Sequence, residues 1–405
     1  MTPMLQPVLL GLLAAFVGFA SSFAVVLAGF AAMGASPEQA ASGLIMLCVL
    51  MGVLGAGFSV VWRMPVSIAW STPGAALLVT TGMPDGGFPA AVGAFLAASL
   101  LLVVAGLWRP FARAVERIPP PIAAAMLAGV LLDLCLAPVR AMGTLPWLAL
   151  PVVLAWAVTL RLSQLWAVPA AVAVAVAALL LGPGLPGAGA WEAPRLVWVT
   201  PSFEWGAMVG IALPLFLVTM ASQNLPGYAV LQANGYKPEM RSVFLATGGG
   251  SFLGAFFCGQ LVNLAAITAA LCAGPESHPD PKRRWVAGLV ASLGYLGFAL
   301  VAGVAASVVA AAPPLLIQAV AGLALLGALA GALTTAMSCE MLRVPAIVTF
   351  VVAASGLSVA GIGAAFWGLL AGATLIWLLN DRASAGEAAA RPGSPPVPPP
   401  GIARG

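Results

Sequence analysis

The sequence predicts an all-α polytopic membrane protein with about fourteen transmembrane segments, arranged as two inverted repeats of seven. Three observations support this fold class. Of the 405 residues, 62% are hydrophobic and 7% are charged, whereas a soluble domain carries roughly a quarter charged residues. Apolar runs close to the ~20 residues that cross a bilayer recur from the N-terminus to residue 379. The two halves of the chain also resemble each other.

The predicted segments are helices, because backbone polar groups in lipid must pair within their own segment unless a barrel closes, and no barrel-like alternation occurs. Seven spans make up the first half: 7–33, 39–62, 66–82, 88–107, 118–136, 146–160 and 165–182. Seven more make up the second half: 204–228, 240–258, 261–274, 284–310, 314–335, 344–357 and 360–379.

The basic residues are biased to one side of this topology. Loops after odd-numbered segments hold only Arg140 and Arg195, and the other fourteen of the sixteen lysines and arginines follow even-numbered segments or the last one. By the positive-inside rule, both termini are expected in the cytoplasm. Residues 381–405 are rich in Ala, Gly, Ser and Pro, so they are expected to form a disordered cytoplasmic tail.

An internal repeat emerges when each residue is compared with the one 201 positions later. Eight residues recur in this way: Val17, Ala20, Ser21, Ala28, Ala32, Gly34, Pro37 and Glu38. Shorter matches after segments three and ten, and within the first half of segments five and twelve, follow in the same order. We therefore predict repeats over residues 1–183 and 204–380. Seven segments in each place the copies in opposite orientations, as in many secondary transporters. Chance similarity in an alanine-rich chain is the alternative.

The third and tenth segments are short and carry signals for a helix that starts in mid-segment. In the third, Ser71 or Thr72 can cap a helix that begins near Pro73 and Gly74. In the tenth, Asn263 is a candidate cap before an apolar run too short to cross a bilayer. Two half-helix N-termini at mid-membrane would offer N–H groups and dipoles to an anion. A proline-kinked segment three and a short re-entrant segment ten are the alternative.

Other polar and aromatic residues lie near these half-helices. Ser22 in segment one, with Gln223 and Asn224 at the matching place in segment eight, would be costly in hydrocarbon unless they face a partner or a cavity. Hydrogen bonding between helices is their alternative role. Phe19 and Trp70 are candidate aromatic walls, although core packing would suit them equally.

Ionisable groups are scarce inside the predicted segments. Asp133, near the outer end of segment five, and Glu340, after segment twelve, are candidates for proton coupling or gating, or else interfacial. No cysteines have metal-site spacing, and no phosphate-binding loop occurs. One histidine without an acid–base constellation argues against an enzyme. We expect no cofactor, no metal and no nucleic-acid partner.

Several motifs resemble those of one known family. Leu213–Gly227 (LPLFLVTMASQNLPG), Asn263–Pro281 and Trp70–Ala76 (WSTPGAA) are similar to segments of the benzoate/proton symporter (BenE) family. Ala364–Gly368 is similar to the family's last segment, and the resemblance covers essentially residues 5–380. It implies proton-coupled uptake of benzoate, a small aromatic carboxylate, across a bacterial inner membrane.

The resemblance also implies the seven-plus-seven fold shared with uracil, nucleobase and sulfate transporters, often assembled as a homodimer. In that fold a core domain, here residues 1–109 and 204–310, carries the substrate against a gate domain, here residues 110–183 and 311–380. The nucleobase relatives use carboxylates on segments eight and ten. This chain has amides in the matching regions: Gln223, Asn224, Gln260 and Asn263. Amides suit an anionic substrate, which a buried carboxylate would repel.

We therefore expect an aromatic-carboxylate/proton symporter in which the N–H groups of Thr72–Gly74 and Asn263–Leu264 bind the carboxylate. Ser22, Gln223 and Asn224 would complete the polar side of the site. Asn263→Asp is then expected to abolish uptake without unfolding the protein. The proton carrier stays open between the substrate carboxyl, Asp133 and Glu340. Alternatives are a transporter of this fold for another anion or a nucleobase, a passive anion channel and, more distantly, an intramembrane enzyme.

Overall fold

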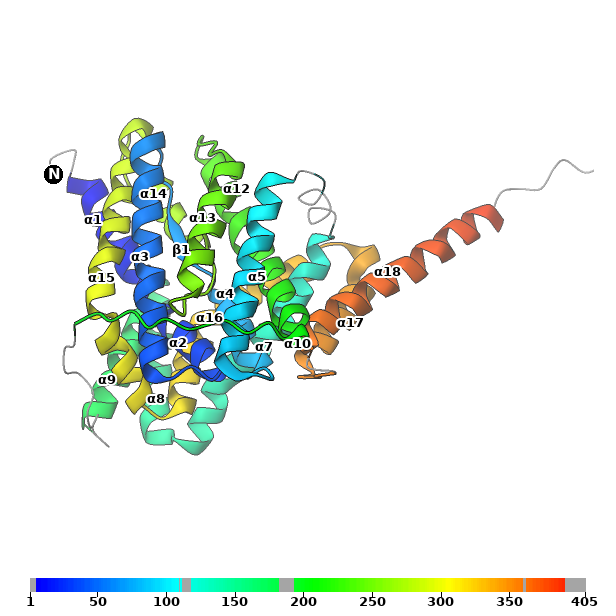
Figure 1. The fold of residues 1–405 in the computed structure, drawn as a ribbon, viewed down its shortest axis with the longest axis horizontal. Helices are drawn as coiled ribbons and strands as arrows, with labels where there is room; N and C mark the ends of the chain where they lie inside the picture. Colours follow the sequence, from blue (N-terminus) through cyan, green and yellow to red (C-terminus); the bar gives the residue numbers. More distant parts are fainter. Residues whose placement is uncertain (1–4, 109, 111–117, 182–192, 360–361, 390–405) are drawn as a thin grey trace, which may run out of the picture.

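The computed structural model describes residues 5–108, 110, 118–181, 193–359 and 362–389. Within these residues the chain forms helices packed side by side, with two three-residue strands among them (Figure 1). Seven helical stretches are long and apolar enough to cross a membrane: Leu5–Ala32, Pro37–Trp62, Gly87–Leu107, Pro120–Thr144, Trp205–Ala233, Pro281–Ala311 and Pro314–Ala336. Three shorter apolar helices cover Pro146–Leu162, Ala167–Leu181 and Ala364–Leu379. The prediction of an all-α polytopic membrane protein is confirmed.

The first half contains seven segments in the predicted order. Segment one is broken into α1 (Leu5–Ala20) and α2 (Phe23–Ala32). Segment three consists of β1 (Ile68–Trp70) and the half-helix α4 (Thr72–Thr81). The other segments are α3 (Pro37–Trp62), α5 (Gly87–Leu107), α7 (Pro120–Thr144), α8 (Pro146–Leu162) and α9 (Ala167–Leu181).

The second half repeats this order. Segment eight is a continuous but irregular helix, made of α10 (Trp205–Ala207), the π-helical turn η1 (Met208–Ala212), α11 (Leu213–Thr219), the π-helical turn η2 (Met220–Asn224) and α12 (Leu225–Ala233). Segment ten consists of β2 (Val262–Leu264) and the half-helix α14 (Ile267–Ala273). The other segments are α13 (Met240–Ala255), α15 (Trp285–Ala311), α16 (Pro314–Ala336), α17 (Arg343–Ala354) and α18 (Ala364–Ala389).

The repeat is visible in the packing as well as in the order. Helix α3 packs on α15 and α13 packs on α5, and these are the second and fourth segments of each repeat with the halves exchanged. The equivalent strands β1 and β2 pair antiparallel, so the two copies run in opposite directions. Gly34 and Gly235, 201 residues apart, end equivalent helices with φ of 88° and 87°. The inverted repeat is therefore confirmed.

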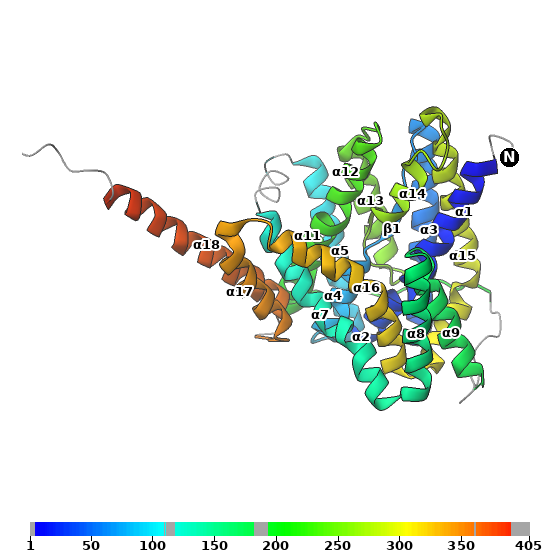
Figure 2. The same ribbon diagram turned by 180° about the vertical axis from the view of Figure 1, so that it is seen from behind.

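The helix contacts divide into two bundles. The first bundle consists of α1–α5 and α10–α15 and contains the strand pair. The second bundle consists of α7–α9 and α16–α18, with α17 and α18 extending to one side (Figure 2). Its helices α7 and α16 pack so closely at Gly322 that a Cβ added there would collide with the carbonyl oxygen of Leu134. The two bundles meet mainly where α2 contacts α16 and α4 contacts α7.

Prolines account for the irregular course of segment eight. A proline lacks an N–H and crowds the carbonyl four residues earlier. For Pro214 and Pro226 these carbonyls belong to Gly210 and Ser222, which lie inside η1 and η2 respectively. Each π-helical turn therefore precedes a proline. The break between α1 and α2 at Ser21 and Ser22 occupies the repeat-equivalent place to η2.

Helices α7 and α18 run furthest past their predicted ends. Helix α7 continues through Pro138 to Thr144, beyond the predicted end at residue 136, because an interior proline is tolerated where neighbouring helices surround the freed backbone. Helix α18 continues to Ala389, past the predicted start of the tail at Asp381. Residues 390–405 lie outside the described residues, so the predicted disorder there stays a prediction.

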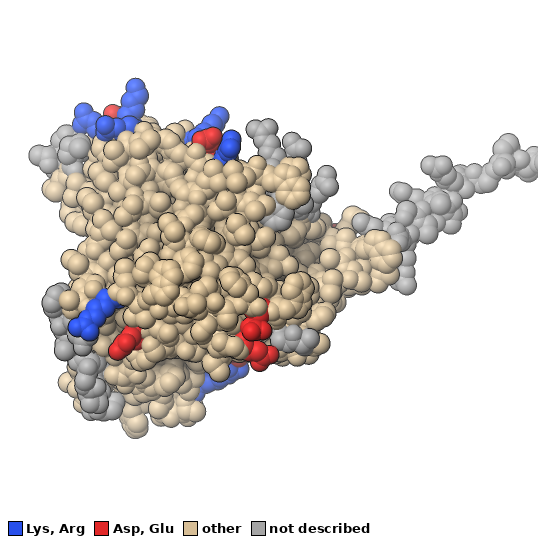
Figure 3. Space-filling view, viewed as in Figure 1, with Lys and Arg blue, Asp and Glu red and all other residues tan. Residues whose placement is uncertain are grey.

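Charged side chains gather at the two ends of the molecule. Figure 3 shows most visible Lys and Arg at the upper end, and a broad uncharged belt below them. This belt has the composition expected of a lipid-facing surface. The upper end is the one predicted to be cytoplasmic.

Candidate functional site

The strand pair brings the starts of the two half-helices together. Ala69 of β1 lies opposite Asn263 of β2. Two further backbone hydrogen bonds extend the ladder, from Ser71 N to the Leu261 carbonyl (3.1 Å) and from Ala265 N to the Ser67 carbonyl (2.9 Å). Helix α4 follows β1 directly, and α14 begins three residues after the end of β2. The prediction of half-helices in segments three and ten is confirmed.

The two half-helices begin differently. Ser71 caps α4, since its Oγ accepts a hydrogen bond from Gly74 N (3.2 Å), and it also shares one with the Thr219 hydroxyl (2.7 Å). Helix α14 follows Ala266 and has no side-chain cap. The expectation that Asn263 caps it is wrong, because Asn263 is still paired in β2.

Buried side chains among the predicted site residues tie segments one and eight to the strand pair and link its two strands to each other. Asn224 Oδ1 accepts a hydrogen bond from Leu264 N (3.0 Å), and Gln260 Nε2 donates to the Ser71 carbonyl (3.2 Å). Ser22 Oγ accepts from Trp70 Nε1 (2.9 Å). All of these residues are buried. The groups named in these hydrogen bonds therefore serve the framework, whereas Gln260 Oε1 is buried without a hydrogen-bond partner among the described residues.

The backbone N–H groups expected to bind a carboxylate are mostly engaged. Leu264 donates to Asn224, and Gly74 donates to Ser71. Asn263 pairs with Ala69 at a position of the ladder where antiparallel partners exchange hydrogen bonds. The expected set of N–H donors is thus corrected for these three residues, because pairing in the strands and the cap of α4 uses them.

The predicted aromatic walls also belong to the core. Phe19 stacks on Phe298 at a centroid distance of 4.5 Å and meets Trp70 at 5.8 Å. Both Phe19 and Trp70 are buried, and neither lines the cavity described next. Core packing, the alternative reading of these residues, is what the structure favours.

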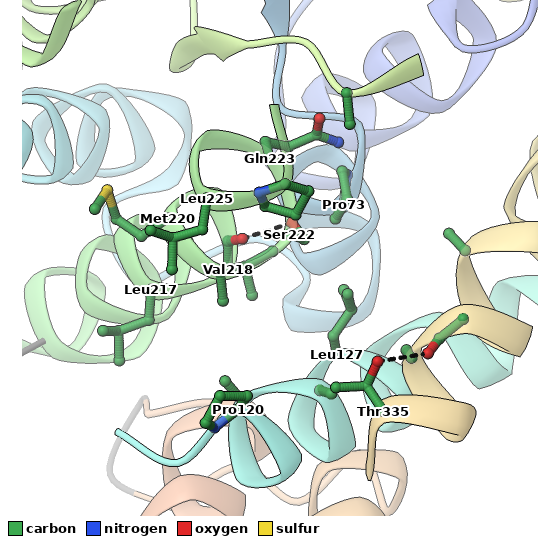
Figure 4. A pocket seen from close by; sticks show the side chains of 18 of the residues that line it. Pro73, Pro120, Leu127, Leu217, Val218, Met220, Ser222, Gln223, Leu225 and Thr335 are labelled. Atoms are coloured by element: carbon green, nitrogen blue, oxygen red, sulfur yellow. Dashed lines mark hydrogen bonds between the residues drawn. The ribbon is translucent and has the colours of Figure 1, made fainter. Parts of the chain in front are cut away.

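A cavity of about 430 Å³ lies between the two bundles, beside the strand pair (Figure 4). One wall comes from the first bundle: Pro73, segment-eight residues between Leu217 and Pro226, and Ala266 and Ile267 at the start of α14. The other wall comes mainly from α7, α16 and α18 of the second bundle, including Pro120, Leu127 and Thr335. None of the described residues that line it is charged. The cavity is mostly apolar, as small-molecule sites usually are.

Gln223 is the predicted polar residue that lines this cavity, and Figure 4 shows it on the first-bundle wall with Pro73. Its side chain is half-buried and has no hydrogen-bond partner among the described residues. Two neighbouring hydroxyls are already engaged, Ser222 with the Val218 carbonyl (2.5 Å) and Thr335 with the Gly331 carbonyl. The Gln223 amide is therefore available to a ligand.

The structure does not bring the predicted proton-coupling residues to this cavity. The Asp133 side chain is 57% exposed and pairs with Arg140 (2.7 Å). The Glu340 side chain is 88% exposed, 3.8 Å from Arg343. The second-bundle wall, including Thr335, was not predicted, because no local sequence signal shows which face of α16 meets segment eight.

An uncharged cavity between two bundles of an inverted-repeat membrane protein is typical of a membrane transporter. Residues 3–378 match the family described as benzoate membrane transport protein, BenE, and the chain belongs to it. It is a membrane transporter and not an enzyme. The chain is 39% identical to inner membrane protein YdcO of Escherichia coli over 373 residues, 92% of this chain and 95% of that protein. It is 31% identical to the benzoate membrane transport protein of Acinetobacter baylyi over 385 residues, 94% and 97% of the two chains.

Solved structures share the fold. The transmembrane domain of the cyanobacterial bicarbonate transporter BicA matches with a TM-score of 0.58 at 12% identity, covering 91% of this chain and 98% of that one. The anion transporter Slc26a9 from mouse, in its inward-facing state, matches with a TM-score of 0.59 at 15% identity, covering 94% and 69%. At these identities the likeness shows the seven-plus-seven fold alone.

Proposed function

We propose that this chain imports benzoate or a related aromatic carboxylate together with protons, by alternating access. The observation that carries the proposal is the uncharged cavity between the bundles, with the free amide of Gln223 in an apolar wall. A single aromatic ring suits the apolar wall, and an amide N–H suits a carboxylate. A carboxylate side chain in this wall would repel such a substrate, and the lining has none among the described residues.

Family membership and the start of α14 support the same substrate class. A relative at 31% identity is named a benzoate membrane transport protein. Ala266 and Ile267 lie on the cavity wall, and no side chain caps the first N–H groups of α14. Helix-terminal N–H groups and the helix dipole favour an anion.

Alternating access would use the two bundles as moving parts. In this proposal the core domain, residues 1–109 and 204–310, moves against the gate domain, residues 110–183 and 311–380. The repeats of residues 1–183 and 204–380 each supply part of both domains. The excess of Lys and Arg at one end supports a topology with both termini in the cytoplasm of a bacterial inner membrane. A homodimer in the bilayer remains part of the proposal.

The proton has three candidate carriers. It can enter on the substrate carboxyl itself, or on Asp133 or Glu340. Neither side chain lines the cavity. The geometry is therefore consistent with two routes for the proton: on the substrate, transported as the neutral acid, or on one of these carboxylates outside the cavity.

The test is uptake of labelled benzoate into proteoliposomes with and without an inward proton gradient. Proton symport predicts accumulation that exceeds the leak of benzoic acid into empty liposomes and collapses with a protonophore. Excess unlabelled uracil or sulfate should not compete. Protein-dependent flux that ignores the proton gradient and never accumulates would identify a passive channel. Competition by uracil or sulfate would identify another substrate.

A further inference from the structure

A second cavity, of about 330 Å³, lies at the other end of the contact between the bundles. From the first bundle it is lined by the end of α4, with Leu77, Thr80 and Thr81. From the second bundle it is lined by α7, with Gly129 and Asp133, and by the regions where α17 ends and α18 begins. It is more polar than the cavity at Gln223, since hydroxyls and a carboxylate reach its wall.

The two cavities lie along the same pair of helices. On α4, Pro73 lines the first cavity and Leu77 the second; on α7, Leu127 lines the first and Gly129 the second. A helix rises about 1.5 Å per residue, so these lining residues are about 6 Å apart along α4 and about 3 Å apart along α7. The two cavities are therefore close neighbours along the contact between the bundles.

The second cavity contains the carboxylate of an ion pair. Asp133 Oδ1 accepts a hydrogen bond from Arg140 Nη1 at 2.7 Å, and both side chains are more than half exposed. Exposed ion pairs are worth about 1 kcal/mol or less, so another carboxylate can replace Asp133 as the partner of Arg140. Of the sixteen basic residues, Arg140, near the end of α7, and Arg195 alone fall on this predicted side.

We propose that the second cavity is a capture site for the carboxylate of an incoming substrate. Arg140 does not itself line the cavity, but its ion pair with Asp133 holds its guanidinium beside the cavity wall, where it is the binding residue and Asp133 is its internal competitor. The substrate exchanges for Asp133 on the guanidinium before it moves to the neighbouring Gln223 cavity. The substrate class of this site is taken from the proposed function, whereas its location is inferred from the two cavities and the ion pair. It predicts opposite effects for the two members of one ion pair.

The first experiment measures benzoate counterflow, which requires no net proton movement, in reconstituted variants. Arg140→Gln should raise the KM on the outer side up to about fivefold, the upper range for an exposed pair, with the maximal rate within twofold. Asp133→Asn should lower that KM, because it removes the competitor. Arg195→Gln is the matched control for surface charge and should leave KM unchanged. If both members of the pair change KM in the same direction, or Arg195→Gln matches Arg140→Gln, the proposal is refuted.

The second experiment separates this site from the proposed function. Thr81→Cys, in a Cys339→Ser background, should react from outside with a membrane-impermeant thiol reagent, and benzoate should slow the reaction. Arg140→Gln should abolish that protection. Protection without any transport would refute the symporter and support the capture site. Reaction that benzoate does not slow, with normal transport, would refute the capture site alone.

Discussion

Gln223 and Asn224 are adjacent amides in η2, yet the structure gives them opposite roles. Gln223 lines the cavity without a partner among the described residues, whereas Asn224 is fully buried and accepts the Leu264 N–H at 3.0 Å. Replacing each by alanine should therefore separate substrate binding from stability.

Gln223→Ala would remove the hydrogen bond that we propose to a charged carboxylate, and such a bond is worth about 1.5–3 kcal/mol. Since 1.4 kcal/mol is about tenfold, the KM for benzoate should rise about 10- to 150-fold. Thermal stability should stay within about 0.5 kcal/mol of wild type, because the half-buried side chain makes no hydrogen bond to another described residue.

Asn224→Ala leaves the buried Leu264 N–H without a partner, which costs about 1–3 kcal/mol of folding free energy. Its apparent melting temperature should fall clearly below that of Gln223→Ala. The assay pairs uptake kinetics in proteoliposomes with thermal melting in detergent, on the same preparations. A wild-type KM for Gln223→Ala, or a raised KM with unchanged melting for Asn224→Ala, would refute the assignment of these roles.

Three further predictions concern the framework. The sequence predicts that Asn263→Asp abolishes uptake in a folded protein. The structure instead predicts a lower yield of monodisperse protein, because Asn263 is fully buried and an unpaired buried charge costs about 3–5 kcal/mol. A normal yield of protein without uptake would support the prediction from sequence. Gly322→Ala should lower the melting temperature through its collision in the α7–α16 contact, while Gly327→Ala on the same helix, with open space around it, should not. Arg284→Met should lower the free energy of unfolding by about 2 kcal/mol or more, because this buried guanidinium donates to the carbonyls of Ala273 and His278, at and after the end of α14. Replacement of the exposed Arg283 by Met is the control, and equal melting temperatures of the two variants would contradict this role.

The ion pair of Asp133 and Arg140 shows that the role of a charged residue in this chain depends on its position in the structure. The two residues are seven apart on α7, and the sequence singled out Asp133 only as an ionisable group near a membrane segment. The cavity beside Asp133, and its closeness to the Gln223 cavity, give that ion pair a place on the substrate route we propose.

The sequence by itself determined the features that depend on composition and on neighbouring residues. Scarce charge and long apolar runs require membrane helices, because lipid cannot satisfy a free backbone. The Ser71 cap and the start of α4 follow from residues within one turn, so they were predictable. The repeat was visible because equivalent helix ends, such as Gly34 and Gly235, need the same left-handed backbone.

The tertiary structure alone decided which polar groups are free. Asn263 carries the same amide as Gln223, but antiparallel pairing with β1 buries it, and no local pattern in the sequence specifies a partner almost two hundred residues away. The wall from α7, α16 and α18 depends on which helix faces meet, which composition in a largely apolar chain does not encode. A site between bundles is therefore set by long-range packing, while the elements that form it are set locally.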